Sequence, residues 1–406
     1  MENVESRLGT PLRIALVTET YPPEINGVAI TLGRMVDGLL KRQHAIHVIR
    51  PRQGKDDVAK VTERFTESLV HGMPIPGYPE LKSGLPAKRK LLQLWRQQRP
   101  DIVHVATEGP LGWSACSAAK LLNIPVCSDF HTNFHNYSQH YGLGWLKKPI
   151  GAYLRHFHNR TQCTLVPTFA LQTSLSQEGY RDVKVVSRGI DTALFHPDKR
   201  SMALRRHWGI EDDALVAILV SRLAAEKNLH LVIRAFEHIQ SIRPNTRLIM
   251  VGDGPARTAL QQKFPQIIFA GMRSGEDLAR HYASADMFLY PSVTETYGNV
   301  TMEAMASGLA VLAYDYAAAR EHIQHEINGL VAPFDDPDAF ISLAKGMAHD
   351  EERLRRMRRN ARASVEHLTW EKINARLESI LTGLVQKHPR STPDFTPKTR
   401  ANALTK

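Results

Sequence analysis

The sequence predicts an α/β protein made of two doubly wound parallel sheets in tandem, and three features of the chain support this fold class. Continuous apolar runs of strand length recur along the chain, as parallel strands covered on both faces require. Helical segments separate these runs. The series then starts again after "GIDTALFHPDKR", where glycine, proline and charges interrupt the pattern. The length of 406 residues is comfortable for two such domains.

The first series of elements predicts an N-terminal domain at residues 1–195. Its first strand leads through the loop "YPPEING" into a helix expected from about residue 28 to 42. The strands expected in this domain are, in order, "LRIALVTET", "AIHVIRP", "DIVHVA", "IPVCSDFH", "CTLVPT" and "VKVVSRG".

The second series predicts a C-terminal domain at residues 196–385. We expect its last helix to pack back on the N-terminal domain. Residues 386–406 hold three prolines and little apolar surface, which predicts a disordered tail. The strands expected in this domain are "ALVAILVSRL", "TRLIMVGDG", "QIIFAGM", "MFLYPS" and "LAVLAYD", with helices such as "NLHLVIRAFEHIQSI" between them.

The charge balance indicates an anionic partner. The formal net charge of +11 suits nucleic acid, a membrane surface or a phosphorylated substrate. Residues 1–195 hold 24 basic and 16 acidic side chains, while residues 196–406 hold 28 and 25, so the N-terminal half carries most of the excess. A nucleic-acid groove would need aromatic residues interleaved with these charges. A membrane surface explains the excess at least as well.

The cysteines and the absence of long apolar runs indicate the compartment. Cys116, Cys127 and Cys163 form no CxxC pair and lie in apolar or helical stretches, which favours buried thiols in a reducing cytosol. The first twelve residues contain no apolar stretch of the secretory type, and no run of 18 apolar residues occurs. We therefore expect neither a secretory signal nor a membrane-spanning helix.

Candidate functional residues lie in the loops after the strands, because ligands of open α/β sheets bind beyond the carboxyl ends of the strands. In "PPEINGVA", Gly27 opens a helix, so backbone amides there could approach an anion. A glycine in this place is also typical of an ordinary turn. In "SRLAAEKN", Arg222 and Lys227 could both reach one diphosphate. The alternative is a pair of solvated charges flanking Glu226.

Two further loops add a tight turn and a histidine cluster. In "VGDGP", Gly252 and Asp253 form a turn that could approach a nucleotide, although a plain turn is the favoured interpretation for Asp253. In "DFHTNFHNYSQHYG", which follows the strand residues "IPVCS", His131 would point into a cleft, with His135 and His140 further along. Their spacing does not match a helical metal pair such as HExxH. No DxD motif stands in a suitable loop, so no metal is expected.

The stretch "ETYGNVTMEA" places two acids around a helix start. Glu295 could accept hydrogen bonds from sugar hydroxyls, or it could cap the helix. Glu303 could accept two hydrogen bonds from a vicinal diol such as a ribose. The alternative for Glu303 is a solvated helix face, which its small and apolar neighbours disfavour, because a buried carboxylate needs partners. The free amides between the acids offer a site for an anion or a hydroxyl group, and they belong to Tyr297, Gly298, Asn299 and Val300.

Taken in chain order, "INGV", "DFHTNF", "SRLAAEKN", "VGDGP" and the Glu295-x7-Glu303 pair resemble the retaining GT-B glycosyltransferases of family four. The resemblance covers about residues 12–385. It implies the GT-B fold, in which two Rossmann-like doubly wound domains face each other across a cleft. The stretch "LVTETYPPEINGVA" is most similar to the branch that glycosylates diacylglycerol-type lipids, which includes α-mannosyltransferases that use GDP-mannose.

The resemblance also implies a role for each site residue. Arg222 and Lys227 would clamp the diphosphate of the donor. Glu303 would hold the ribose hydroxyls, and Glu295 would hold hydroxyls of the donor sugar. His131 would contact that sugar near the reacting carbon.

Two positions depart from the family pattern. Many relatives have Gly-Gly where this chain has Asn26 and Gly27, and Gly27 would face the diphosphate or the acceptor. Many relatives have Asn before the "GID" turn where this chain has Arg188. Both departures leave the acceptor geometry open, and Arg188 adds a charge near the hinge between the domains.

The function that the resemblance implies is hexosyl transfer with retention of the anomeric configuration. The sugar would be mannose or glucose, the donor GDP-mannose or a UDP-sugar, and the acceptor a membrane lipid or a glycan. Neither a cofactor nor a metal is expected, and nucleic acid is not an expected partner. Two alternatives stay open. One is a nucleotide-sugar epimerase with the GT-B fold, and the other is a nucleic-acid-binding protein, which is disfavoured.

Residues 81–99, "LKSGLPAKRKLLQLWRQQR", predict where such an enzyme meets a membrane. The segment holds six basic and no acidic side chains, and its leucines and tryptophan fall at helical spacing. This is the pattern of an interfacial helix on anionic lipid. A surface helix packed on the domain core is an equally good interpretation. A second patch at residues 145–148 adds Trp, Leu and two Lys. We expect a cytoplasmic protein, peripheral to the inner face of the membrane.

Overall fold

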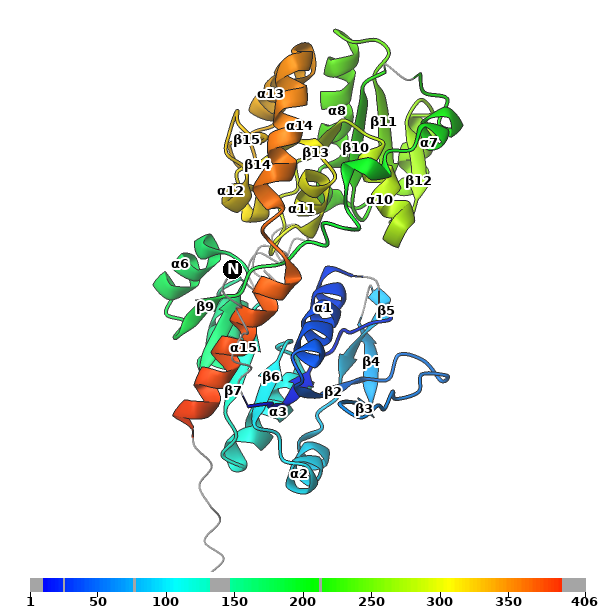
Figure 1. Cartoon of the computed structure of the whole chain (residues 1–406). Helices are drawn as coiled ribbons and strands as arrows, with labels where there is room; N and C mark the ends of the chain where they lie inside the picture. The colour runs from blue at the N-terminus through cyan, green and yellow to red at the C-terminus, as the bar shows by residue number, and fades with distance from the viewer. Residues whose placement is uncertain (1–9, 25, 76–77, 132–146, 212–213, 389–406) are drawn as a thin grey trace, which may run out of the picture.

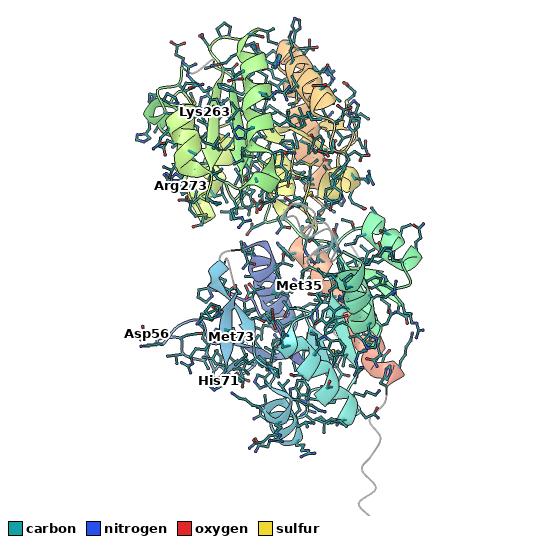
Figure 2. All side chains as sticks on the ribbon, turned by 180° about the vertical axis from the view of Figure 1, so that it is seen from behind. Met35, Asp56, His71, Met73, Lys263 and Arg273 are labelled. Atoms are coloured by element: carbon teal, nitrogen blue, oxygen red, sulfur yellow. The ribbon has the colours of Figure 1, made fainter. Side chains whose placement is uncertain are left out.

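The computed structural model describes residues 10–24, 26–75, 78–131, 147–211 and 214–388. Figure 1 shows two lobes, with the N-terminal lobe below and the C-terminal lobe above. Figure 2 shows them from behind, with Met35 in the N-terminal lobe and Lys263 on the C-terminal lobe. Each lobe contains a parallel sheet with helices packed against it, which confirms the predicted fold class of two doubly wound domains.

The N-terminal sheet has, within the described residues, seven strands in the order β3-β2-β1-β6-β7-β8-β9, and all neighbouring strands are parallel. The chain changes its direction of travel across the sheet between β1 and β6. Such a switch point is where loops separate and ligands bind. A two-stranded antiparallel sheet pairs β4 with β5. The bounds are β1 (Arg13–Val17), β2 (Ala45–Pro51), β3 (Phe65–Val70), β4 (Gly72–Ile75), β5 (Tyr78–Gly84), β6 (Ile102–Val105), β7 (Val126–Asp129), β8 (Cys163–Val166) and β9 (Val183–Val185).

The C-terminal sheet has six described strands in the order β12-β11-β10-β13-β14-β15, again with parallel neighbours. Its switch point lies between β10 and β13. The loops that follow these two strands therefore meet at one edge of the sheet. The bounds are β10 (Val216–Val220), β11 (Arg247–Val251), β12 (Ile268–Gly271), β13 (Met287–Tyr290), β14 (Ala310–Tyr314) and β15 (Leu330–Ala332).

The helices follow the strands, and several are capped by a polar side chain. The side chain of Asn26 accepts hydrogen bonds from two backbone N–H groups at the start of α1 (Gly27–Lys41). Such a cap contributes about 1 kcal/mol. The remaining helices are α2 (Lys88–Gln97), α3 (Pro110–Leu121), α5 (Lys147–His158), α6 (Phe169–Gln177), α7 (Met202–His207), α8 (Leu229–Gln240), α9 (Arg257–Lys263), α10 (Gly275–Ala283), α11 (Asn299–Ala306), α12 (Ala317–His322), α13 (Pro337–His349), α14 (Glu351–Val365) and α15 (Trp370–Lys387), with 3₁₀ turns η2 (Pro197–Lys199) and η3 (Ala225–Lys227).

Every strand expected from the sequence has a counterpart, and the helix expected near residues 28–42 is α1. The strands that the sequence did not predict are β3, β15 and the β4–β5 pair. β3 reads "FTESLV", with polar residues inside it, and β15 has only three residues, "LVA". Neither shows the long apolar run by which the other strands were recognised.

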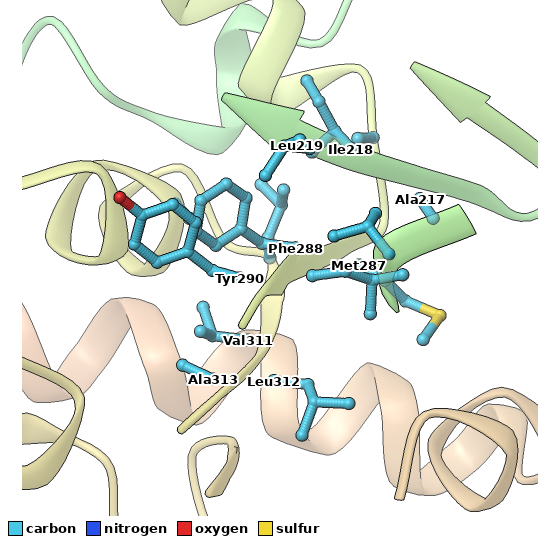
Figure 3. Packing of buried hydrophobic residues seen from close by; sticks show 14 of the residues in the cluster. Ala217, Ile218, Leu219, Met287, Phe288, Tyr290, Val311, Leu312 and Ala313 are labelled. Atoms are coloured by element: carbon cyan, nitrogen blue, oxygen red, sulfur yellow. The ribbon is translucent and has the colours of Figure 1, made fainter. Parts of the chain in front are cut away.

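The core of the C-terminal lobe shows why its strands are continuous apolar runs. All five residues of β10 and all five of β14 are buried, because helices cover both faces of the sheet. Figure 3 shows Ile218, Phe288 and Val311, which lie in register on three adjacent strands, and each is fully buried. Burying one such side chain contributes about 1.5–3 kcal/mol.

The last helix, α15, crosses from the C-terminal lobe onto the N-terminal lobe (Figure 1). Leu377 and Leu381 are fully buried in the N-terminal core, where α15 packs against α1. The predicted domain boundaries themselves stay a prediction. Of the tail predicted at 386–406, the first two residues belong to α15, and residues 389–406 lie outside the described part of the chain.

The two chain segments that pass between the lobes lie side by side. Ile190 and Thr369 form a parallel bridge. The neighbouring Gly189 is packed so closely that an added Cβ would lie 2.5 Å from the backbone nitrogen of Trp370. Only glycine avoids this overlap, so the close approach of the two crossings explains the glycine in the "GID" turn.

Residues 81–99 form the end of β5 and helix α2, whose apolar stripe packs on the core. Leu91 and Trp95 are 0% and 1% exposed and belong to the N-terminal core. The stripe is therefore not free to enter a lipid layer, and this corrects the expectation of an interfacial helix with an open apolar side. Lys88, Arg89 and Lys90 are exposed.

Two other findings bear on the membrane. Among the described residues, no helix is long and apolar enough to cross a membrane. Of the second patch expected at residues 145–148, the first two residues lie outside the described chain, and Lys148 is exposed in the first turn of α5.

Candidate active site

Two helix starts from opposite lobes face each other at the junction of the lobes. α1 starts at Gly27, and α11 starts at Asn299 directly after Gly298. Gly298 has φ +90°, which lies in the left-handed region that favours glycine. A Cβ added at Gly27 would lie 3.9 Å from Asn299 Nδ2. The positive ends of two helices thus converge, and the start of α11 has no side-chain cap, whereas Asn26 caps α1. This arrangement favours an anionic group at the start of α11.

Beside the start of α11, Glu295 is held by three donors. Its Oε1 atom contacts Lys227 Nζ and accepts hydrogen bonds from the hydroxyls of Tyr290 at 2.5 Å and Ser292 at 2.7 Å. A cavity borders this group and is lined in part by Glu295, Tyr290, Ser292 and Gly298. The predicted phosphate ligand Lys227 and the predicted sugar ligand Glu295 therefore lie together, as an ion pair.

The Lys227 ammonium stays charged in this setting. Burial alone would lower its pKa, but the Glu295 carboxylate and the Tyr290 hydroxyl outweigh burial, so the pKa of Lys227 is raised above its ordinary value. The Lys227 side chain is 14% exposed and lies 3.3 Å from Ser292 Oγ. The Lys227 ammonium is therefore a positive charge, largely shielded from water, beside the start of α11.

Arg222 lies just after β10, and its partner is Glu226. An Arg222 Nη2 hydrogen bond reaches Glu226 Oε1, and the Arg222 side chain is 37% exposed, whereas that of Glu226 is 3% exposed. Burial would raise the pKa of Glu226, but Arg222 outweighs burial and lowers it. Glu226 therefore acts as an anionic support that orients a half-exposed guanidinium.

Glu303 occupies the second turn of α11, on a covered side of the helix. Its Oε2 atom accepts a hydrogen bond from the hydroxyl of Tyr282 at 3.0 Å. Burial raises the pKa of Glu303 to about 7, and the Tyr282 hydrogen bond opposes this only in part. A carboxylate in this environment favours further hydroxyl donors, because each one compensates for lost hydration. The half-buried side chain and its hydrogen bond to Tyr282 count against the alternative of a solvated helix face.

The "VGDGP" turn is shaped by close backbone contacts. A Cβ added at Gly252 would lie 1.9 Å from the carbonyl oxygen of Ser221, and both Gly252 and Gly254 have positive φ. Asp253 pairs with Arg257 at 2.7 Å and accepts a hydrogen bond from the backbone N–H of Gly254. Through these two contacts, Asp253 stabilises the conformation of the turn. A role for Gly252 and Asp253 in binding the donor stays a prediction.

Tyr297 lies in the turn between the two acids, and its side chain is buried. The hydroxyl of Ser187 donates to the Tyr297 hydroxyl at 3.3 Å, and the Tyr297 hydroxyl lies 3.0 Å from His322 Nε2. Burial lowers the pKa of His322 to about 4, so its imidazole is neutral and can accept this hydrogen bond. The Tyr297 side chain links the lobes, and only its backbone amide remains available at the helix start. Val300, in the first turn of α11, is half-buried.

His131 lies at the end of β7, but both of its ring nitrogens face protein groups. Nε2 lies 3.0 Å from Asp129 Oδ2, and Nδ1 lies 3.0 Å from Arg188 Nη2. Thr296 Oγ1 donates to the backbone carbonyl of His131 at 2.5 Å. The expectation that the imidazole itself would contact the donor sugar finds no support in this arrangement. His135 and His140 lie outside the described residues.

Sequence reasoning missed three residues of this group. Asp129 and Thr296 were not singled out, although each is adjacent to a predicted site residue or one position removed from it. Arg188 was noted only as a departure from the family pattern. Among the residues that the structure describes, no group of three or more His, Cys, Asp or Glu side chains could hold a metal ion.

The arrangement of charges and helix starts suits a donor with an anionic leaving group, and comparison with known proteins identifies the family. Residues 25–194 match the family described as "Glycosyltransferase Family 4", and residues 201–364 match "Glycosyl transferases group 1". A GDP-mannose-dependent alpha-mannosyltransferase of Corynebacterium glutamicum is 31% identical over 370 residues, which cover 90% of this chain and 88% of the relative. This chain belongs to the family-four glycosyltransferases.

Other relatives and solved structures agree with this assignment. An alpha-monoglucosyldiacylglycerol synthase of Streptococcus pneumoniae is 28% identical and covers 75% of this chain and 71% of the relative. Anabaena Alr3699/HepE, solved in complex with UDP and glucose, has a TM-score of 0.72 at 18% identity and covers 92% of this chain and 100% of that one. The GT-B fold and the glycosyltransferase activity expected from the resemblance are confirmed, and the epimerase and nucleic-acid-binding alternatives are set aside.

Proposed function

We propose that this glycosyltransferase moves mannose from GDP-mannose to a hydroxyl group of a membrane lipid, with retention of the anomeric configuration. Relatives at 31–32% identity are named GDP-mannose-dependent alpha-mannosyltransferases, which supports the donor, and they come from Corynebacterium glutamicum, Mycobacterium tuberculosis and Mycolicibacterium smegmatis. Two relatives named alpha-monoglucosyldiacylglycerol synthase, at 26–28% identity, support a lipid acceptor. As a class of reaction, the activity is hexosyl transfer from a nucleotide sugar to a lipid or glycan acceptor.

The observation that carries this proposal is the Lys227–Glu295 pair beside the start of α11. A diphosphate next to Lys227 would meet a charged ammonium and the N–H groups of Gly298 and Asn299. The sugar attached to that diphosphate would then lie beside Glu295, whose carboxylate accepts hydrogen bonds from hydroxyls. One nucleotide sugar can thus satisfy both members of the pair.

The remaining site residues complete the donor site. The half-exposed guanidinium of Arg222 would bind the diphosphate from a second side, held in place by Glu226. Glu303, with its buried carboxyl group, would accept hydrogen bonds from the ribose hydroxyls. Gly252 and Gly27 would allow backbone to approach the nucleotide and the acceptor.

The chemistry follows from these placements. As the bond between the anomeric carbon and the diphosphate breaks, Arg222, Lys227 and the start of α11 stabilise the departing negative charge. The acceptor hydroxyl attacks the same face of the sugar, and its proton passes to the departing phosphate oxygen. Glu295 Oε1 is already held by three donors, which suits a binding role better than that of a nucleophile.

The N-terminal lobe would meet an anionic membrane surface by charge. Because Leu91 and Trp95 are buried in the core, the contribution of α2 is its exposed cations and not the insertion of apolar side chains. The enzyme would then be peripheral to the inner face of the membrane. The basic excess of residues 1–195 agrees with this direction of docking.

The test is a donor and acceptor panel with purified protein. GDP-mannose, UDP-glucose, UDP-galactose and UDP-N-acetylglucosamine are each incubated with liposomes that contain diacylglycerol or a glycosylated diacylglycerol, and released nucleotide and glycolipid are measured. We expect GDP release with GDP-mannose and an α-linked product by NMR. A β-linked product would refute retention, and turnover of UDP-sugars alone would refute the donor. Lys227→Ala serves as the inactive control.

A further inference from the structure

Two consecutive residues of the hinge contact opposite lobes. Ser187 donates to the hydroxyl of Tyr297 in the C-terminal lobe at 3.3 Å. Arg188 Nη2 lies 3.0 Å from His131 Nδ1, and its Nη1 donates to the carbonyl of Val186 at 3.2 Å, both in the N-terminal lobe. Arg188 is only 6% exposed. A guanidinium is thus buried at the hinge, directly against the histidine that ends β7.

The contact with Arg188 determines where the proton of His131 lies. An arginine side chain only donates hydrogen bonds, so His131 Nδ1 must accept and carries no proton. A neutral imidazole then has its proton on Nε2, which lies 3.0 Å from Asp129 Oδ2. On its other oxygen, Asp129 faces His104 Nε2 at 2.8 Å. The tautomer therefore follows from the Arg188 hydrogen bond alone, because the 3.0 Å approach of Nε2 to Asp129 lacks hydrogen-bond geometry.

We propose that Arg188 is a positioning residue of the transferase: it holds His131 as the neutral tautomer protonated on Nε2, so that no imidazolium charge lies beside the donor site. Thr296 Oγ1 donates to the backbone carbonyl of His131, so His131 lies next to the loop that carries Glu295. This inference rests on the proposed function for the location of the donor, but the tautomer itself can be tested without any substrate.

The requirement for a neutral ring follows from the charge that develops during transfer. Breaking the bond to the diphosphate leaves positive charge on the sugar ring. An imidazolium ion near that charge would be unfavourable, whereas a neutral imidazole adds no repulsion. The negative charge of Asp129 would normally recruit a proton to His131. Arg188 supplies the balancing positive charge instead, so the imidazole can stay neutral.

The groups around His131 set the direction of its titration. Burial lowers the pKa of His131, Asp129 and Glu108 act to raise it, and Arg188 acts to lower it. The net result is a pKa below the ordinary value of 6.5. Removing the charge of Arg188 deletes one of the lowering influences and leaves only burial to oppose Asp129 and Glu108. The pKa of His131 should then rise, and the ring should become charged at a higher pH than in the wild type.

The first experiment is NMR of the full chain labelled with ¹⁵N-histidine, and it uses no substrate. The His131 signals are assigned by their loss in His131→Asn. We expect the neutral Nε2–H tautomer in the wild type from about pH 6 to 8. In Arg188→Gln, the same signals should move to the imidazolium position with a midpoint at least about one pH unit higher than in the wild type. An Nδ1–H tautomer in the wild type, or the same midpoint in both proteins, would overturn the proposal.

The second experiment measures hydrolysis and transfer of the donor sugar against pH. Arg188→Gln should lose at least about 10-fold in kcat at pH 6 relative to its own value at pH 8, with the KM for the donor changed by less than about 3-fold. Arg188→Lys keeps the charge and should keep the wild-type pH profile. In Arg188→Gln combined with His131→Asn, the loss on the acid side should disappear, because residue 131 no longer titrates.

The matched control is Arg34→Gln, which removes a different cation that contacts the hinge. Arg34, in α1, pairs with Asp191 of the crossing segment at 3.0 Å, and its side chain is 42% exposed. If Arg34→Gln shows the same loss at acid pH, the effect belongs to the hinge in general and the proposal fails. Thermal unfolding of every variant shows whether it is folded. If no donor is turned over at all, the proposed function fails, while the tautomer result still decides the role of Arg188.

Discussion

Lys227 Nζ contacts Glu295 Oε1, although 68 residues separate the two in the chain. Lys227 follows β10 and Glu295 follows β13, and these two strands are neighbours at the switch point of the C-terminal sheet. Their carboxyl-terminal loops therefore meet, and the ion pair is a direct consequence of the topology. A bound nucleotide sugar has to share or replace this pair, which leads to separate expectations for its two members.

Removing either cation, Lys227 or Arg222, should reduce the stabilisation of the transition state and slow turnover. Lys227→Ala or Arg222→Ala should each cost about 2–4 kcal/mol of transition-state stabilisation, as expected for one preorganised charge at a developing anion. This corresponds to a loss of roughly 30- to 1,000-fold in kcat/KM. The measurement is donor turnover at saturating acceptor. Lys263→Ala, on the outer side of the C-terminal lobe (Figure 2), is the control and should leave turnover unchanged. Full activity of both cation variants would refute the diphosphate clamp.

Removing Glu295, the acid of the pair, should affect turnover and nucleotide affinity differently. Glu295→Ala should impair turnover but leave the affinity for the free nucleoside diphosphate undiminished, because Lys227 loses its competing carboxylate. Titration calorimetry with the nucleoside diphosphate measures this affinity, and a modest gain is expected. An affinity loss as large as that of Glu303→Ala would show that the two acids have been assigned the wrong roles.

Glu303 should couple nucleotide binding to pH. Its pKa is raised by burial from 4.5 to about 7, so the charged form exists only as the pH rises through this value. Ribose hydroxyls donate to the carboxylate, so nucleoside diphosphate affinity should increase from pH 6 to pH 8 and then level off. Glu303→Gln should bind the nucleotide more weakly at pH 8 and lose the pH dependence. A wild-type affinity independent of pH would contradict the ribose role.

The same shift has a consequence for folding. Because the folded-state pKa of Glu303 lies above the unfolded value, the buried charge destabilises the fold as the pH rises above about 4.5, and the cost is complete above about 7. Glu303→Gln should therefore raise the unfolding free energy at pH 8, by an amount on the order of 2 kcal/mol, and change it little at pH 4.5. Chemical denaturation at the two pH values measures the difference.

The sequence predicted much of this architecture because the signals are local. Continuous apolar strands, such as β10 and β14, and the glycine and acid positions around α11 are readable from short stretches of chain. The strand β3 was not predicted from the sequence because its core-facing side carries Glu67, which pairs with Arg50 of the neighbouring strand at 3.0 Å. A strand whose buried face is an ion pair has no apolar run to detect.

The parts of the site that were missed depend on contacts between distant segments. Arg188 and His131 are 57 residues apart, and Thr296 and His131 are 165 apart. No spacing in the sequence shows that these side chains meet. Arg188 reaches His131 because β7 and β9 belong to one sheet, and Thr296 reaches it from the other lobe. For the same reason the apolar stripe of α2 was compatible with both a core and a membrane until the burial of Trp95 decided it.

Removal of divalent metal should leave activity intact. The charges of Arg222 and Lys227, together with the start of α11, supply the positive potential that a metal ion would otherwise bring to the diphosphate. Turnover in excess EDTA should therefore equal turnover in buffer that contains magnesium, to within about 2-fold. Complete loss in EDTA that is restored by added metal would refute the expectation that no metal is required.

Docking to a membrane should depend on the charges of α2 and not on its apolar stripe. Lys88, Arg89 and Arg96 are exposed, whereas Lys90 already donates to the carbonyl of Leu69 at 2.7 Å. Each cation near an anionic surface contributes about 1 kcal/mol, screened by salt. Changing Lys88, Arg89 and Arg96 together to Glu should therefore abolish co-sedimentation with anionic liposomes at low salt, and wild-type binding should fall as salt is added.

A charge-matched control separates docking by α2 from a general loss of positive charge. Changing Lys263, Lys345 and Arg356 to Glu alters the net charge equally but lies on the C-terminal lobe, where all three are exposed, and it should preserve liposome binding. Leu91→Ala should instead destabilise the fold, by about 2–5 kcal/mol, because Leu91 is buried in the core. If both charge-reversal triples lose binding equally, the surface is not specific to α2. If the wild type ignores anionic liposomes at low salt, docking through the N-terminal lobe is wrong.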